Sequence, residues 1–362
     1  MNHDSMKQGR KSHMRIRCRP VCEICGERGV LLYHSLKDCL FEVSGEWSFR
    51  KCLNPDCGLL WIDPLPTEDD CGMAYQNYYT HAPSEVTMGS KQGVFDGIMR
   101  MLNRFNKSLL FVYLHRKYGY PRNYQNWSCL LYFLSIIRKN FYDAYVMYLP
   151  FTKNGRLLDV GSGSGEFLAR MDSLGWNVEG VEPDSSAFRL AKRTLRLSIR
   201  CGTLGEQDYP DSCFDAITLD HVVEHVHNPL DLLKECYRIL KPGGIIAVKT
   251  PNNTSICSRI FGPHWRGLEP PRHLQIFSST SLKRVALAAN FKISSLRSTV
   301  RGGYILSSSY ALKKGTPFHS IIPQINRGYV VIFEILAMVE VLIASVKPCI
   351  GEELVLVGIR GR

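Results

Sequence analysis

Residues 156–166 have the sequence RLLDVGSGSGE. Arg156–Val160 is short and mostly apolar, which predicts a strand, and three glycines at alternating positions follow it. Residues Phe167–Leu174 then have the spacing expected of a helix. A strand that runs through a glycine-rich turn into a helix indicates the ligand-binding end of a doubly wound α/β domain.

The same alternation continues along the chain. Further strands are expected at Asn177–Val181, Phe214–Leu219 and Ile245–Thr250, and further helices at Ala187–Leu197 and Leu230–Leu240. Strands that alternate with helices imply a parallel sheet with right-handed crossovers. Ligands of such sheets bind beyond the carboxyl ends of the strands, near the point where the strand order reverses.

The glycine-rich turn favours S-adenosylmethionine over a dinucleotide. The dinucleotide pattern G-x-G-x-x-G needs a glycine at position 166, where this chain has Glu166. A carboxylate there would oppose a pyrophosphate at the helix N-terminus. S-adenosylmethionine carries a cationic sulfonium and an ammonium group, so acidic residues such as Asp159 suit it. Glu182, at the end of the second strand, is placed to accept hydrogen bonds from both ribose hydroxyls.

Five segments, in order, resemble the successive motifs of class I methyltransferases, and the ubiquinone-biosynthesis O-methyltransferases are the most similar subgroup. They are residues 158–165 (LDVGSGSG), 181–184 (VEPD), 214–217 (FDAI), 224–226 (EHV) and 240–244 (LKPGG). The resemblance covers about residues 155–300. It implies a Rossmann-like, doubly wound, seven-stranded and mostly parallel sheet. The last strand, expected at Leu354–Arg360, is antiparallel in that fold.

The resemblance assigns nine residues to the methyl donor: Asp159, Gly161, Gly163, Gly165, Glu182, Thr203, Leu204, Asp220 and His221. It implies that the glycines, with Asp159 beside them, line the methionine part and that Glu182 holds the ribose. Thr203 and Leu204 would border the adenine. Asp220 and His221 would flank the methionine end. Many relatives have an acid where Thr203 stands.

Methyl transfer to oxygen needs a base for the hydroxyl proton, and histidine has a suitable pKa. The candidates are His225, His273 and His221. His273 lies in the loop after the fifth strand, where acceptor contacts are usual in the family. In that loop, Trp265 and Arg272 are expected to shape the acceptor pocket and attract an anionic substrate. The alternative for His225 is that it only packs and hydrogen-bonds behind the site.

Residues 221–225 also match the H-x-x-E-H signature of a class of zinc proteases. His221 directly follows an expected strand, however, so the two histidines are not expected on one long helix. This placement disfavours a protease.

Two cysteine pairs near the N-terminus predict a structural zinc site. Cys22 and Cys25 form one pair, Cys52 and Cys57 the other, and a glycine follows each pair. Two such pairs complete a tetrahedral S4 site, which leaves no open position for catalysis. A redox role for Cys22 and Cys25 is the alternative. The thirteen cysteines and the absence of a signal sequence predict a reducing, cytoplasmic location.

The expected organisation is a basic, disordered tail at 1–20, a zinc ribbon at 21–70, a helical linker or cap at 71–150, and a methyltransferase domain at 151–362. That domain has a hydrophobic helical insertion at about 313–350. Its most apolar part, Tyr329–Val346, contains Glu334 and Glu340, which oppose a membrane span. A helix packed on the domain, or lying at the inner face of the membrane, is expected instead.

These observations predict methyl transfer from S-adenosylmethionine to a small-molecule, sugar or glycan acceptor, at oxygen. Zinc ribbons joined to such domains resemble methyltransferases of bacterial surface-glycan and sugar biosynthesis. The net charge of +12 keeps an RNA methyltransferase as an alternative. It is disfavoured because residues 220–223 read DHVV instead of an N/D-P-P-Y turn. A non-catalytic S-adenosylmethionine-binding protein is the other alternative.

Overall fold

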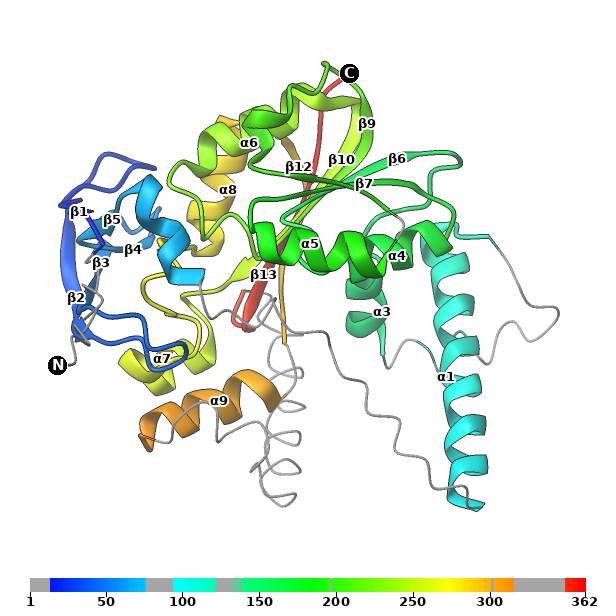
Figure 1. Cartoon of the computed structure of the whole chain (residues 1–362), viewed down its shortest axis with the longest axis horizontal. Coiled ribbons are helices and arrows are strands. Elements are labelled where there is room, and N and C mark those ends of the chain that lie inside the picture. The colour runs from blue at the N-terminus through cyan, green and yellow to red at the C-terminus, as the bar shows by residue number, and fades with distance from the viewer. Residues whose placement is uncertain are drawn as a thin grey trace, which may run out of the picture.

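In the computed structural model of the chain, a seven-stranded sheet has the strand order β12-β13-β10-β9-β6-β7-β8 (Figure 1). The strands are β6 (Arg156–Val160), β7 (Asn177–Glu182), β8 (Ser198–Cys201), β9 (Phe214–Asp220), β10 (Leu240–Pro251), β12 (Lys292–Thr299) and β13 (Glu353–Ile359). The strands from β10 to β8 are parallel, and β13 is antiparallel to both of its neighbours. The predicted doubly wound sheet with an antiparallel last strand is confirmed.

The structure describes residues 14–75, 94–121, 132, 135, 138–195, 197–300, 303–315 and 349–362. Most of the expected tail at 1–20 and most of the expected insertion at 313–350, including Tyr329–Val346, lie outside these residues. Residues 14–20 are described, and β1 (Ile16–Arg17) pairs there with β5 (Leu65–Pro66). Within the described ranges, no helix is both long and apolar enough to cross a membrane.

Side-chain caps fix the start of several helices that connect the strands. The helices of the catalytic part are α4 (Glu166–Ser173), α5 (Ser185–Thr194), α6 (Pro229–Ile239), α7 (Ile256–Phe261), α8 (Ser279–Ala288) and α9 (Gly303–Lys313). The Asp184 carboxylate accepts from the backbone N–H of Ser186 at 2.7 Å and so caps α5. Asn228 caps α6, and Pro229 occupies its first turn.

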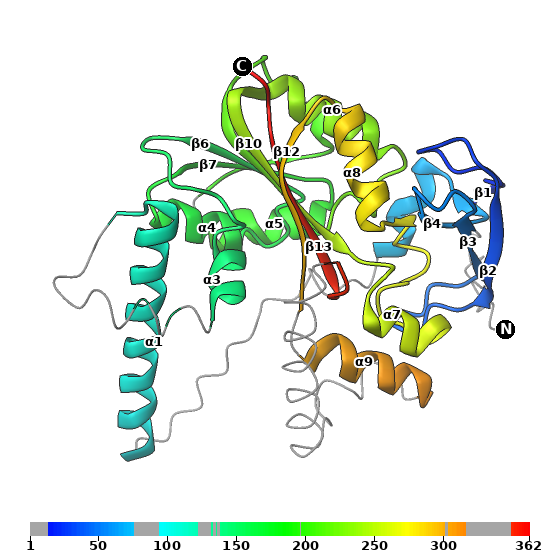
Figure 2. The same cartoon turned by 180° about the vertical axis from the view of Figure 1, so that it is seen from behind.

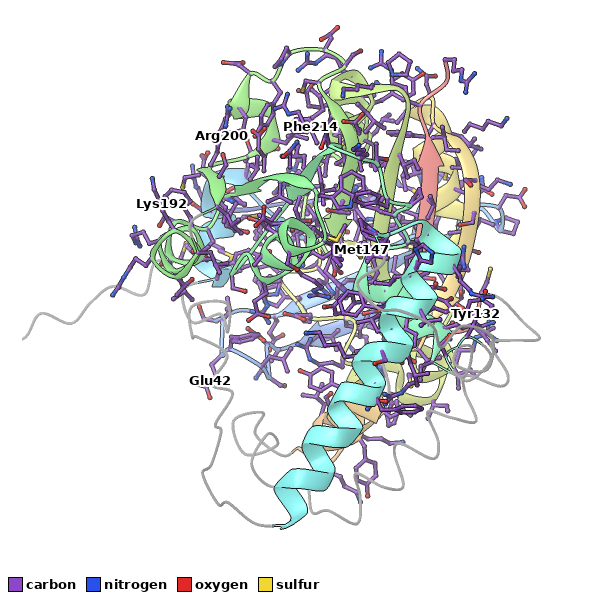
Figure 3. All side chains as sticks on the ribbon, turned by 90° about the vertical axis from the view of Figure 1, so that its right-hand side faces the viewer. Glu42, Tyr132, Met147, Lys192, Arg200 and Phe214 are labelled. Carbon is purple, nitrogen blue, oxygen red and sulfur yellow. The ribbon has the colours of Figure 1, made fainter. Side chains whose placement is uncertain are left out.

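Successive residues of the central strands pack on opposite faces of the sheet, as the alternation of a strand requires. Leu158 and Ile217 belong to a core with α6 and α8. Leu157 and Ala216 belong to a second core with α4, α1 (Val94–Tyr118) and α3 (Lys139–Tyr145). Figure 3 shows α1 crossing this side of the molecule, near Met147 of the same core.

A second sheet lies at the opposite end of the molecule from α1 (Figures 1 and 2). Its strand order is β11-β4-β3-β2. Three strands come from the cysteine-rich part of the chain: β2 (Gly29–Leu36), β3 (Trp47–Cys52) and β4 (Leu60–Ile62). The fourth, β11 (Gln275–Ile276), comes from the catalytic part and pairs antiparallel with β4. The N-terminal module therefore completes its sheet with residues that lie more than 200 positions later.

Candidate active site

The glycine turn after β6 leaves room for a ligand. Gly161, Gly163 and Gly165 have φ angles of +72°, +52° and +77°, a region that favours glycine. A Cβ on Gly163 would meet no atom within 4 Å, whereas one on Gly161 would lie 2.6 Å from Val222. The turn therefore contacts the segment after β9 at Gly161 and is open at Gly163.

Glu182 ends β7 directly beside this turn. Its Oε2 accepts from the Gly163 N–H at 2.7 Å, and its Oε1 accepts from the Asp184 N–H at 2.8 Å. Burial raises the pKa of this carboxyl group, and the two backbone hydrogen bonds oppose that shift. A carboxylate has about four lone-pair sites, so two remain that suit a pair of ribose hydroxyls.

Asp159 lies under the turn and is 4% exposed. It accepts a hydrogen bond of 2.6 Å from the Thr218 hydroxyl. Burial raises the pKa of Asp159 to about 7 in spite of this bond. A cationic ligand nearby would favour the ionised form and lower this pKa. Thr218 was not predicted, because a buried threonine within a strand carries no functional signal in the sequence.

The other residues assigned to the donor lie along the same edge of the sheet. Thr203 and Leu204 follow β8, where the Thr203 N–H donates to Glu206 at 2.7 Å and Leu204 is buried. Asp220 ends β9 and forms an ion pair of 2.8 Å with Lys249. All nine residues therefore lie at or just beyond the carboxyl ends of β6, β7, β8 and β9, where ligands bind in open α/β sheets.

His221 is held between two carboxylates. Its Nδ1 lies 2.9 Å from Glu224 Oε1 and its Nε2 lies 2.8 Å from Glu353 Oε1. Burial alone would lower the pKa of His221, but the two hydrogen bonds and charges raise it to about 9. Protonated on both nitrogens, His221 offers no lone pair and is unsuited to act as a base near neutral pH. Glu353 was missed in the sequence, although an acid that opens an otherwise apolar strand is a usable signal.

His225 and His273 lie together, with ring centroids 4.8 Å apart. Nδ1 of His225 is 3.0 Å from the Arg272 carbonyl oxygen, and Nδ1 of His273 is 2.8 Å from the Gly267 carbonyl oxygen. A carbonyl oxygen only accepts, so these two contacts favour the tautomer with the hydrogen on Nδ1 and a lone pair on Nε2. Tyr75, which the sequence did not suggest, places its hydroxyl 2.9 Å from His225 Nδ1.

The two histidines differ in exposure. Burial lowers the pKa of His273 to about 4, whereas His225 is only partly buried. Glu224 lies beside them, and its Oε2 accepts from the Thr250 hydroxyl at 2.9 Å. Ligand atoms of Glu224, His225 and His273 lie within 4.8 Å of one another, so this group could hold a metal ion. Both carboxylate oxygens of Glu224 already have a hydrogen-bond partner: Nδ1 of His221 for one and the Thr250 hydroxyl for the other.

Arg272 cannot attract an anionic substrate in the way that the sequence led us to expect. Its side chain is fully buried, and it forms ion pairs of 2.8 Å with Asp38 and 2.9 Å with Glu269. Its charge is thus neutralised inside the protein. Trp265 is also buried, and its Nε1–H donates to Glu352 at 3.3 Å. Both residues support the loop that carries His273.

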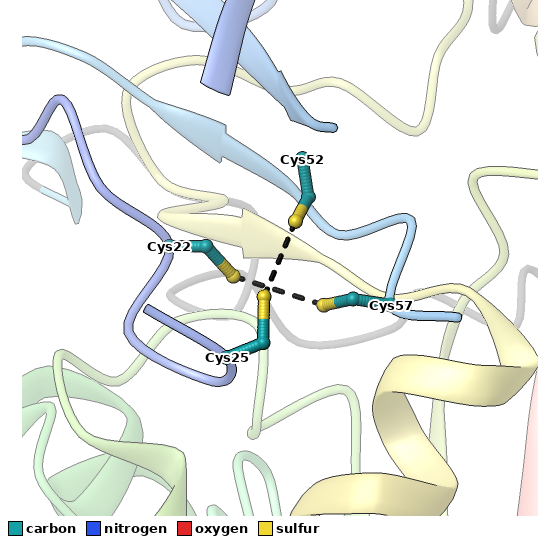
Figure 4. Close-up of side chains that lie close together, drawn as sticks. All are labelled: Cys22, Cys25, Cys52 and Cys57. Carbon is teal, nitrogen blue, oxygen red and sulfur yellow. Dashed lines mark hydrogen bonds between the residues drawn. The ribbon is translucent and has the colours of Figure 1, made fainter. Parts of the chain in front are cut away.

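The four cysteines predicted to bind zinc converge (Figure 4). The sulfur atoms of Cys22 and Cys57 are 3.7 Å apart, those of Cys25 and Cys52 are 3.3 Å apart, and all four lie within 4.8 Å of one another. Tetrahedral zinc with Zn–S bonds of about 2.3 Å needs S···S distances of about 3.8 Å. The cluster therefore fits a tetrahedral S4 site.

Comparison with known proteins agrees with this geometry. Residues 133–296 match the sequence model of the family described as a methyltransferase domain. These residues therefore form a methyltransferase domain, and the glycine turn and the strand order agree with the class I S-adenosylmethionine-dependent type expected from the sequence.

Three curated relatives are similar to part of the chain. The mitochondrial ubiquinone biosynthesis O-methyltransferase of Rattus norvegicus is 33% identical over 110 residues, which cover 28% of this chain and 32% of that protein. The ubiquinone biosynthesis O-methyltransferase of Bradyrhizobium sp. (strain ORS 278) is 37% identical over 102 residues, with coverages of 27% and 40%. A probable S-adenosylmethionine-dependent methyltransferase of Mycolicibacterium smegmatis is 28% identical over 138 residues, with coverages of 38% and 52%. The chain thus spans between a third and about half of the length of these relatives.

A solved structure of an S-adenosylmethionine-dependent methyltransferase from Archaeoglobus fulgidus is 18% identical, with a TM-score of 0.42. The match covers 62% of this chain and 93% of that structure.

Proposed function

We propose that this protein transfers the methyl group of S-adenosylmethionine to a hydroxyl oxygen of a small-molecule, sugar or glycan acceptor. The observation that carries the proposal is the hydrogen bond from His225 Nδ1 to the Arg272 carbonyl. It leaves the lone pair of Nε2 available at a partly buried residue close to the donor residues. The names of the similar ubiquinone biosynthesis O-methyltransferases also favour oxygen as the acceptor atom.

The residues present fit the methyl donor. The open space at Gly163 suits the methionine part, and Glu182 beside it suits the ribose hydroxyls. The buried carboxyl of Asp159 supplies negative potential beneath the turn. Bound S-adenosylmethionine supplies an electrophilic methyl group on a positively charged sulfur.

His225 is the base in this proposal. Transfer to the acceptor oxygen would break the carbon–sulfur bond of the donor, and the sulfur would keep that electron pair. The acceptor's hydroxyl proton moves to Nε2 of His225. His221 cannot take it because it is already protonated, and a pKa of about 4 makes His273 a weak proton acceptor.

We also propose that Cys22, Cys25, Cys52 and Cys57 bind one structural zinc ion. Four thiolates close the coordination sphere, so such an ion stabilises the module and takes no part in catalysis. The sulfur distances support this assignment, and three of the four cysteines are buried. The predicted cytoplasmic location and the contact with a membrane surface stay predictions.

Purified protein should be incubated with S-adenosylmethionine and a panel of catechols, other phenols, nucleotide sugars and transfer RNA. We expect S-adenosylhomocysteine together with a methyl ether of one of the hydroxylic acceptors. Methylated RNA as the only product would favour an RNA methyltransferase. Donor binding without turnover on any acceptor would favour a binding protein.

A further inference from the structure

The segment that carries β11, residues 272–278, is here named the bridging segment. On one side it is bonded to the cysteine-rich module. The Ile62 N–H donates to the Leu274 carbonyl at 3.0 Å, and β11 pairs with β4. The Ser278 hydroxyl donates to the carbonyl oxygen of Cys57, one of the proposed zinc ligands, at 2.5 Å. The module therefore holds the main chain of the bridging segment at several points.

On its other side the bridging segment is bonded to the turn after β9. The Leu274 N–H donates to the Glu224 carbonyl at 2.8 Å, and the side-chain amide of Gln275 donates to the Val226 carbonyl at 2.8 Å. The Arg272 carbonyl accepts from Nδ1 of His225 at 3.0 Å. The bridging segment therefore lies between the cysteine-rich module and the turn that carries the proposed base.

One buried ion pair fixes Arg272, the first residue of the bridging segment. Nη1 and Nη2 of Arg272 each donate to the Asp38 carboxylate at 2.8 Å, and both side chains are 0% exposed. Asp38 follows β2 of the module, and its Oδ1 also accepts from the N–H groups of Leu40 and Phe41. A bidentate pair of this kind fixes the direction of the guanidinium as well as its position.

We propose that Asp38 is a positioning residue for methyl transfer: by holding Arg272, it fixes the backbone carbonyl that sets the tautomer and orientation of His225. This inference rests on the proposed function, in which Nε2 of His225 accepts the proton. The Arg272 carbonyl stabilises hydrogen on Nδ1 only while it stays in place, and a small displacement of a catalytic group is costly. The Glu182 carboxylate bonds to the N–H groups of Gly163 and Asp184, so the ribose contact assigned to it is not expected to respond.

Asp38→Asn is the sharpest test. The amide keeps one oxygen, Oδ1, for Leu40, Phe41 and Nη2 of Arg272. It replaces Oδ2, which accepts from Nη1 of Arg272 and from the Val43 N–H, with a donor that cannot accept from either. Glu269 remains as a partner of the guanidinium. Glu46→Gln is the matched control, because Glu46 lies in the same module and its side chain is 59% exposed.

Three quantities should be measured in the full-length protein: the 15N spectrum of its histidines, the S-adenosylmethionine affinity, and kcat with the acceptor found in the panel. We expect Asp38→Asn to shift the ring nitrogens of His225 away from the pure Nδ1–H tautomer. We also expect kcat to fall at least tenfold and donor affinity to stay within twofold. Glu46→Gln should match the wild type in all three.

If Asp38→Asn has the same histidine spectrum and the same kcat as the wild type, the inference is wrong. A loss of donor affinity as large as the loss of kcat would also overturn it, because Asp38 would then support the whole fold. If Asp38→Asn does not fold, Asp38→Glu replaces it, since that change keeps the charge and displaces it by one methylene. Failure of the wild type to methylate any acceptor would refute the proposed function alone, while the His225 spectrum would still decide the role of Asp38.

Discussion

Nε2 of His221 lies 2.8 Å from Oε1 of Glu353, and this contact joins the end of β9 to the start of β13. The two residues are 132 positions apart in the chain. Glu224 holds the other ring nitrogen, so one imidazolium is shared by two buried carboxylates. The contact stabilises the edge of the sheet where the donor residues lie.

Glu353→Gln should therefore destabilise the protein in a pH-dependent way. Loss of a hydrogen bond to a charged group costs about 1.5–3 kcal/mol. The folded pKa of His221, about 9, is above its ordinary value of 6.5. Its contribution is therefore fully present below pH 6.5 and is lost as the pH rises through about 9. Urea unfolding of both proteins should give a full difference at pH 6 and a small one at pH 10. A difference that grows with pH would contradict the assigned charge.

The ionisation of Glu224 determines how much the contact with His221 stabilises the protein at low pH. Burial alone would raise its pKa, but the hydrogen bond and charge of His221 lower it to about 2. Because this is below the ordinary value of 4.5, its contribution is present above pH 4.5 and is lost as the pH falls toward 2. Acid unfolding monitored by circular dichroism should therefore begin at a higher pH in His221→Gln than in the wild type.

Glu182→Ala should weaken donor binding. The change removes a buried carboxylate that we assign to the ribose hydroxyls, at a cost of about 1.5–3 kcal/mol, or roughly 10- to 150-fold in Kd. Calorimetry with S-adenosylmethionine measures this directly. Glu179→Gln is the control, because Glu179 is on the same strand and forms an ion pair with Arg156 instead. Equal affinity in Glu182→Ala and the wild type would remove Glu182 from the donor site.

His225→Asn should lower kcat by about 10²- to 10⁴-fold, the usual contribution of a general base. Donor affinity should stay close to that of the wild type. His273→Asn should have a smaller effect on kcat, because the neutral ring of His273 packs beside the proposed base. Steady-state rates with the identified acceptor separate the two variants. The reverse order of effects would make His273 the base.

The purified protein should contain one zinc ion per chain. Cys57→Ser should lose it, since three thiolates form a weaker site than four. Cys39→Ser should keep it, because Cys39 is exposed and lies outside the cluster. Elemental analysis gives the metal content of each variant. A folded, metal-free wild-type protein would favour the redox alternative for Cys22 and Cys25.

Local patterns predicted most of the catalytic sheet. The glycine turn, Glu182 and the apolar strands at β6, β7, β9 and β13 are all recognisable within a few residues. The edge strands β8 and β12 were not identified, because their short or half-exposed sequences lack a clear apolar alternation. The four cysteines that converge were also recognisable in the sequence, since the spacing within each pair is a local property.

The charge states in the site could not be predicted in this way. Whether His221 is protonated depends on Glu353, and whether Arg272 is neutralised depends on Asp38, which lies 234 positions away. Such partners are brought together by the tertiary fold, and the hydrophobic periodicity of the sequence does not predict them. The two residues whose roles changed most, His221 and Arg272, are those with distant buried acids.

The pairing of β11 with β4 also has a consequence during synthesis. The Ser278 hydroxyl that bonds to the Cys57 carbonyl is made 221 residues after it. At about 5–20 residues per second, a ribosome needs roughly 10–45 s to cover that distance. Throughout this interval the nascent cysteine-rich module lacks its fourth strand, and β4 presents an unpaired edge that is open to wrong partners. Metal capture by the four thiolates during translation would hold the rest of the module folded through this interval, so zinc supply should affect the yield of folded protein as well as its stability.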